Sequence, residues 1–115
     1  MWIEIEQYVV NRSKLQGFTY NSKDKNILVL LTDAIFYVQH NINLNDALIY
    51  YQFINELYDL KMHFFEHSCV IFDNLSNLTI INNAVYTTRN IDQHILLGDS
   101  KSLPTDLITY YNMEI

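Results

Sequence analysis

Three residues near the middle of the chain have the types and the spacing of a zinc site: His63, Glu66 and His67. Imidazole is a common zinc ligand, and a neighbouring glutamate can activate a metal-bound water for hydrolysis. Side chains four positions apart lie on the same face of a helix, so the two histidines could reach one metal ion with the glutamate beside it. A helical conformation here would favour a small metal-dependent hydrolase.

Residues 63–67 have the sequence pattern H-x-x-E-H of the inverted zinc-protease motif. The chain resembles those enzymes only in this pattern of residue types and spacing. Those enzymes are much larger and take a third ligand from a distant helix, whereas only residues 68–115 follow the motif here. We therefore treat zinc bound by His63, His67 and Cys69 as an alternative, and the main interpretation includes no cofactor. Cys69 begins an apolar run, which favours a buried and unreactive thiol.

The segment that carries this motif, residues 43–66, is predicted to form one long helix that ends near residue 67. At about 100° per residue its apolar side chains fall into two neighbouring ridges. The first comprises Leu44, Ala47, Leu48, Tyr51, Ile54, Tyr58, Met62 and Phe65, and the second Tyr50, Phe53, Leu57, Leu60 and Phe64. Asn43 and Asp46 resemble a capping pair at the start. Two apolar ridges need two contact surfaces, so the helix should lie in a curved sheet or between a sheet and a partner.

A narrow polar strip runs along the same predicted helix. Its carboxylates are spaced three or four residues apart, so their side chains should form one row that can receive Lys or Arg from another protein. The residues predicted to bind a partner are Gln52, Glu56, Tyr58, Asp59, His63 and Glu66. The alternative interpretation is that the strip is the solvated face of an amphipathic helix.

Strand-like runs precede and follow the predicted helix, at residues 2–10, 27–31, 34–39, 69–72, 78–81, 84–88 and 91–97. The run 27–31 is apolar throughout, which predicts a central strand covered on both faces and paired with 34–39. The runs 69–72, 78–81 and 84–88 predict a three-strand meander, and Pro104 is typical of the first turn of a short C-terminal helix. We expect residues 1–115 to form a single α+β domain with a mostly antiparallel curved sheet packed on the long helix.

Composition and charge restrict the function. The chain has 115 residues, half of them apolar, with nine Tyr, six Phe, one Cys and a net charge of −6. Residues 27–115 contain ten carboxylates and three Lys or Arg, which is unfavourable for binding nucleic acid. The longest apolar run, 27–31, is far shorter than the ~20 residues that cross a bilayer. The single cysteine and an acidic start without a leader pattern predict a cytoplasmic protein that does not insert into a membrane.

These observations favour a small acidic domain that binds a basic partner protein, such as a toxin or an enzyme, and occludes its site. Immunity proteins, antitoxins and phage-encoded inhibitors share this profile of size, charge and composition, which is an analogy of class only. A homo-oligomeric structural protein, for example a homodimer paired through the second ridge, is a further alternative. In the main interpretation the protein is not an enzyme.

Overall fold

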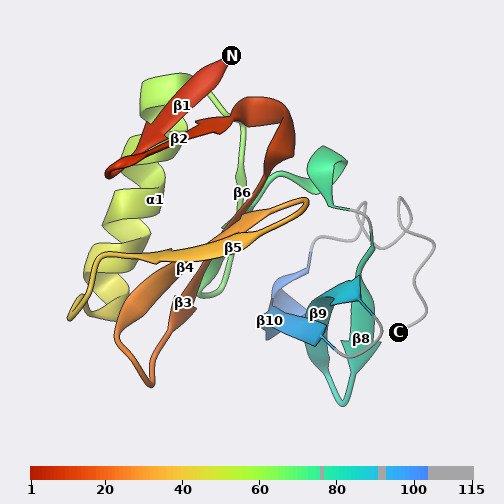
Figure 1. The fold of residues 1–115 in the computed structure, drawn as a ribbon. Coiled ribbons are helices and arrows are strands. Elements are labelled where there is room, and N and C mark those ends of the chain that lie inside the picture. Colours follow the sequence, from red (N-terminus) through yellow and green to blue (C-terminus); the bar gives the residue numbers. More distant parts are fainter. Residues whose placement is uncertain (76, 91–92, 104–115) are drawn as a thin grey trace.

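The computed structural model describes residues 1–75, 77–90 and 93–103, which contain three antiparallel sheets and one α-helix (Figure 1). The strands are β1 (Trp2–Ile5), β2 (Tyr8–Asn11), β3 (Leu15–Asn21), β4 (Asn26–Leu31), β5 (Ile35–Val38), β6 (His63–Phe65), β7 (Ser68–Val70), β8 (Thr79–Ile81), β9 (Ala84–Asn90) and β10 (Gln93–Asp99). Helix α1 spans Leu44–Tyr58, and the short 3₁₀ turns η1, η2 and η3 span Arg12–Lys14, Phe72–Asn74 and Ser100–Ser102. The predicted α+β class is confirmed. In these ranges no helix has the length and apolar character needed to cross a membrane.

Five strands form the central sheet in the order β5-β4-β3-β7-β6, and each neighbouring pair is antiparallel. β4 lies between β3 and β5 and supplies side chains to two cores, Ile27 and Val29 to one and Leu30 to the other. A strand covered on both faces is apolar along its whole length. The prediction of a central strand at 27–31, paired with the next strand, is therefore confirmed.

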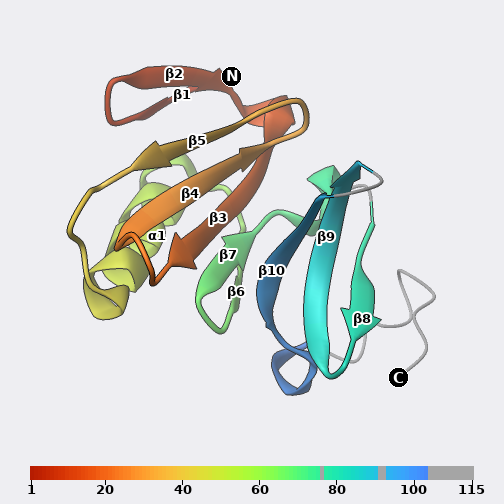
Figure 2. The ribbon, with the colours of Figure 1, turned by 60° about the horizontal axis from the view of Figure 1, so that its bottom comes forward.

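The central sheet is the middle one of three layers (Figure 2). Helix α1 and the β1–β2 hairpin pack on one face, and the β8–β9–β10 sheet packs on the other. The hairpin lies beside the helix, since the Glu4 amide donates a hydrogen bond of 2.9 Å to the Tyr58 hydroxyl. It also contacts β5, where the ring centroids of Tyr8 and Phe36 are 4.3 Å apart.

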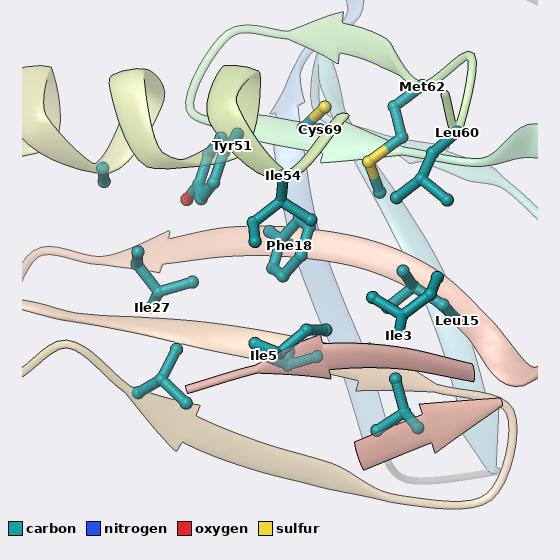
Figure 3. Packing of buried hydrophobic residues seen from close by; sticks show 14 residues of the cluster. Ile3, Ile5, Leu15, Phe18, Ile27, Tyr51, Ile54, Leu60, Met62 and Cys69 are labelled. Carbon is teal, nitrogen blue, oxygen red and sulfur yellow. The ribbon is translucent and has the colours of Figure 1, made fainter. Parts of the chain in front are cut away.

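Tyr51 and Phe18 lie in the core between α1 and the central sheet (Figure 3). Their rings stack with centroids 5.4 Å apart and planes 11° apart. The Tyr51 hydroxyl donates to the His67 carbonyl at 3.2 Å, so its buried polar atom has a partner. Burial raises the pKa of the Tyr51 phenol far above its ordinary value, which keeps this donor protonated. Ala47 and Ile54 lie in the same core and fix the buried face of the helix.

A buried polar contact joins the central sheet to β10 across the second core. The Ser68 hydroxyl of β7 lies 2.7 Å from both the Thr19 hydroxyl of β3 and the Leu97 carbonyl of β10. The Thr19 hydroxyl donates to the Leu96 carbonyl at 3.3 Å. Both side chains are buried, and buried hydroxyls need such partners. The contact therefore holds two layers in register within an otherwise apolar interface.

Helix α1 begins where the sequence predicts but ends earlier. At its start the Asn43 side chain accepts a hydrogen bond of 2.8 Å from the Asp46 amide. At its end Asp59 adopts a left-handed conformation with φ of 50°, and the Leu60 amide donates to the Asn55 carbonyl at 3.0 Å. This is the bonding pattern of a Schellman motif, with Asp in the position that Gly usually occupies. The prediction that the helix continues to about residue 67 is wrong.

The residues after the helix form a strand, for a physical reason. Leu60 and Met62 pack into the first core, whereas Phe65 packs into the second. The Met62 amide donates to the Asn55 side chain at 2.9 Å, which stabilises the turn out of the helix. His63–Phe65 then pair with β7 as the edge strand β6. An apolar segment that supplies two cores on opposite sides of a sheet cannot continue a helix that lies on one side of it.

Two further predictions need correction. Residues 2–10 form a hairpin instead of one strand, because the chain turns at Glu6 with φ of 55°. The run 69–72 belongs to the central sheet, so the meander consists of β8, β9 and β10. Asn82 and Asn83, both with positive φ, form the turn between β8 and β9. The C-terminal helix predicted from Pro104 lies outside the described residues.

Candidate functional site

The structure does not bring the residues of the H-x-x-E-H sequence together on a helix. His63 lies in β6, where its ring packs against Phe72 with centroids 4.8 Å apart. Glu66 and His67 form the turn between β6 and β7, and Glu66 has a left-handed backbone with φ of 57°. The i, i+4 argument for two zinc ligands on one face therefore fails, because it depended on the helix.

Cys69 does not complete a metal site. Its side chain lies in β7 and is fully buried in the core beneath α1. Burial raises the pKa of the Cys69 thiol to about 12, which disfavours the thiolate that binds metal or acts as a nucleophile. Within the described ranges, no group of three His, Cys, Asp or Glu side chains is placed to hold a metal ion. The expectation of a buried thiol is confirmed.

The predicted acidic row is interrupted because Glu66 lies in the β6–β7 turn and not on the helix. Its carboxylate accepts a hydrogen bond from the Asp99 amide at the end of β10. The other carboxylate oxygen is 3.9 Å from the His67 Nδ1 atom. Glu66 therefore links the β6–β7 turn to the outer sheet, and neither it nor His63 extends the polar strip of α1.

The remaining four residues of the predicted partner surface stay near α1. Gln52 and Glu56 are exposed, and the Gln52 amide donates to the Glu56 carboxylate at 3.2 Å. Asp59 is exposed at the helix end, where its carbonyl accepts a hydrogen bond of 3.1 Å from the Arg12 guanidinium. Tyr58 is half-buried against the hairpin. A short acidic flank on the helix thus replaces the long row.

The outward face of α1 carries three large apolar side chains that the sequence interpretation did not identify as a surface. Ile49, Phe53 and Leu57 have exposed fractions of 57%, 57% and 58%. They are four residues apart, so they form one continuous row on the helix, which we call the α1 ridge. Phe53 and Leu57 belong to the predicted second ridge, whereas Ile49 could have been found by extending their spacing by one turn.

The α1 ridge is turned to solvent by the packing of the opposite face. Ala47, Tyr51 and Ile54 are buried in the first core, and at about 100° per residue they point away from the ridge. The first predicted ridge thus meets the central sheet through Ala47, Tyr51 and Ile54. The second ridge is divided: Leu60 is buried in the same core, whereas Phe53 and Leu57 are exposed among the described residues. Exposed apolar rows of this kind on a small domain mark interaction sites.

Carboxylates, and no cations, accompany this ridge on the helix. Asp46 precedes Ile49 by three residues, and Glu56 follows Phe53 by three, so each lies next to the ridge. Residues 44–58 contain no Lys, Arg or His. An apolar centre with a negatively charged flank is complementary to an apolar surface rimmed by Lys or Arg.

The chain matches no protein-family model, and no curated protein or solved structure is significantly similar to it.

Proposed function

We propose that the protein is a non-catalytic binding domain that docks a basic partner protein through the outward face of α1. The observation that carries this proposal is the α1 ridge, in which Ile49, Phe53 and Leu57 are each more than half exposed at consecutive helical turns. Truncating such a cluster usually removes most of the binding energy of an interface, because it forms the dry centre. Fully burying one such side chain contributes about 1.5–3 kcal/mol.

The charge distribution favours a basic partner over a second copy of the chain. Two copies paired through α1 would place Asp46 and Glu56 of each helix near carboxylates of the other, with no cation on either helix. Like charges brought together at an interface cost several kcal/mol. A partner with Lys or Arg around an apolar groove replaces this repulsion with attraction and also associates faster, since opposite charges steer the encounter.

The geometry of the ridge suits the recognition mode in which one helix lies in a groove. Anchors at positions i, i+4 and i+8 are those that a groove reads from an amphipathic helix. The residues flanking the ridge, Asn45, Gln52 and Glu56, are exposed and polar and provide a hydrated rim. Because α1 is held by its own core, the docking face is preorganised and costs little ordering entropy on binding.

The mode of action that we propose is occlusion of the partner's site, in the manner of immunity proteins, antitoxins and phage-encoded inhibitors. A cytoplasmic location is part of this proposal, since the single cysteine is a buried free thiol. The product of a neighbouring gene is the first candidate partner, because immunity and antitoxin genes usually sit beside the gene of their toxin.

Site-specific photo-cross-linking in the native host tests the docking face. A photoreactive phenylalanine analogue placed at Phe53 should cross-link to one basic protein. The same analogue at Tyr37, an aromatic residue of β5 with a similar exposed fraction of 50%, is the matched control and should give no such product. The captured partner is then purified and its binding is measured with and without Glu56→Lys, which should slow association several-fold at low salt.

Three results would overturn the proposal. The first is cross-linking at Phe53 that is no more specific than at Tyr37. The second is a partner whose association rate does not change with Glu56→Lys. The third is a stable dimer of the purified chain in sedimentation velocity that Phe53→Ser converts to monomers, since a second copy would then occupy the ridge.

A further inference from the structure

A cavity of about 430 Å³ opens beside the C-terminal end of α1, and its wall gathers positive charge in an otherwise acidic protein. Arg12, Lys61 and His63 line it together with Asp73. Apolar side chains of Leu60, Ile71 and Phe72 form another part of the wall. The volume lies within the range of small-molecule sites. We propose that this cavity binds a small organic anion, with a phosphate or carboxylate group at the cations and an apolar body against the apolar wall.

The fold brings Arg12, Lys61 and His63 together from segments far apart in the sequence. Arg12 follows β2 in the turn η1, and its guanidinium donates to the carbonyl of Asp59 at the helix end. The chain then leaves the helix and places Lys61 and His63 at the same end. η2 closes the cavity, where the Asn74 side chain donates to the Arg12 carbonyl at 3.3 Å. The early helix end at Asp59 is what creates this site.

In the part of the chain that the structure describes, neither cationic side chain of the cavity forms an ion pair. Among the described residues the ion pairs are Lys14 with Asp33 and His67 with Glu66, so neither Arg12 nor Lys61 takes part in one. Asp73 lines the same cavity but lies beyond 4.0 Å from both. Two unpaired cations in a chain with a net charge of −6 favour an anionic ligand.

The side chains suit a phosphate or carboxylate chemically. Arg12 uses one of its five N–H donors on the Asp59 carbonyl, and the others remain for a planar or tetrahedral anion. Hydrogen bonds in which donor and acceptor are both charged are shorter and stronger than those between neutral groups. The His63 ring packs on Phe72, which extends an aromatic surface next to the cations. A ligand with a charged head and a flat or aliphatic body satisfies both parts of the wall.

This inference does not rest on the proposed docking function. The cavity is formed by the residues that follow α1 and by η1 and η2, whereas the ridge consists of Ile49, Phe53 and Leu57. A protein that fails to bind through the ridge can still bind an anion in the cavity, and the reverse also holds. The two proposals are tested with different variants and different probes.

Titration followed by ¹H–¹⁵N NMR tests the cavity with four probes: phenyl phosphate, benzoate, inorganic phosphate and phenol. We expect saturable shifts at Arg12, Lys61 and His63 with phenyl phosphate or benzoate, and the stronger of the two identifies the head group. Inorganic phosphate should bind at least about tenfold more weakly than phenyl phosphate, since it lacks the apolar body. Shifts with none of the anions, or equal shifts with neutral phenol, would overturn the proposal.

Substitution of the cationic side chains tests whether they are responsible for the binding seen in the NMR titration. Arg12→Gln should weaken phenyl phosphate binding about tenfold and Lys61→Gln several-fold, in line with the loss of charge-assisted hydrogen bonds. Lys25→Gln is the matched control, because Lys25 is also an exposed lysine with a left-handed backbone, φ of 52° against 55° for Lys61. Circular dichroism confirms that each variant folds. Unchanged affinity in Lys61→Gln and Arg12→Gln, or an equal loss in Lys25→Gln, would contradict the assignment.

Discussion

The ring of Tyr51 lies almost parallel to that of Phe18, 5.4 Å away between centroids, and this contact fixes which face of α1 is buried. Tyr51 comes from the helix and Phe18 from β3 in the middle of the central sheet. Because α1 is held at this point and by the neighbouring Ala47 and Ile54, the α1 ridge has to face solvent. The exposure of the α1 ridge is thus a consequence of how the core packs.

Tyr51→Ala should lower the free energy of unfolding by about 3–5 kcal/mol, since it removes a fully buried aromatic ring and leaves a cavity. Tyr51→Phe loses only the bond to the His67 carbonyl and should cost about 1 kcal/mol. The matched control is Phe53→Ala, an exposed aromatic residue of the same helix, which should change stability by less than about 0.5 kcal/mol. Urea unfolding measures all three. A large loss in Phe53→Ala would mean that the ridge supports the fold.

Ser68→Ala should destabilise the contact between the central sheet and β10 by about 1–3 kcal/mol, because it leaves buried polar partners unsatisfied. The double variant Ser68→Ala with Thr19→Val removes both hydroxyls and should lose less than the sum of the single losses. Hydrogen exchange of the amides of β9 and β10 should report the loosening first. Strict additivity of the two losses would show that the hydroxyls do not act together.

Asp59→Gly should raise the free energy of unfolding by up to about 1 kcal/mol, because Gly adopts the left-handed conformation at the helix end without steric cost. Asp59→Val should lower it, since a β-branched residue is strained at φ of 50°. Thermal unfolding followed by circular dichroism measures both changes. A loss of stability in Asp59→Gly would indicate that the Asp59 side chain has a structural role beyond its backbone.

Stability should fall as the pH rises above about 9, in part through Cys69. The pKa of its thiol is raised from an ordinary value of 9.0 to about 12 in the folded protein. Between these values the unfolded chain loses the proton while the folded chain keeps it, so the free energy of unfolding decreases by up to about 1.4 kcal/mol per pH unit. Below pH 9 both states are protonated and this contribution is fully present.

The Cys69→Ala variant isolates that contribution. Its free energy of unfolding, measured in urea between pH 9 and 10.5, should decrease less steeply with pH than that of the wild type, whatever the absolute loss from the smaller side chain. Equal slopes would show that the Cys69 thiol titrates alike in the folded and unfolded chains.

Local patterns predicted the parts of the fold that depend on neighbours in the sequence. The apolar run 27–31 indicated a doubly covered strand, and Asn43 with Asp46 indicated the helix start; both follow from short-range physics. The helix end was missed because Asp59, and not Gly, occupies the left-handed position. The residues beyond it continue the apolar spacing of a helix, although they pack into two different cores. The sequence pattern is the same in both cases, so only the tertiary structure shows that the helix has ended.

The candidate surfaces were predictable to different degrees. Phe53 and Leu57 belonged to a second apolar ridge for which the sequence required a contact surface. Periodicity alone did not show that these two side chains are exposed while Leu60 of the same ridge is buried. The cavity was not predictable, since Arg12 and Lys61 are 49 positions apart in the sequence (61 − 12) and meet only because the helix ends at Asp59. His63 appeared as a metal ligand because its helical spacing to His67 was assumed.

The central claim is that the α1 ridge is the binding surface for a basic partner, and the dissociation constant for the partner cross-linked at position 53 tests it most directly. Isothermal titration should give an affinity that Phe53→Ser weakens more than about tenfold, equivalent to 1.4 kcal/mol or more. Tyr37→Ser, the control on β5, should bind like the wild type. Equal dissociation constants for Phe53→Ser and the wild type would contradict the claim.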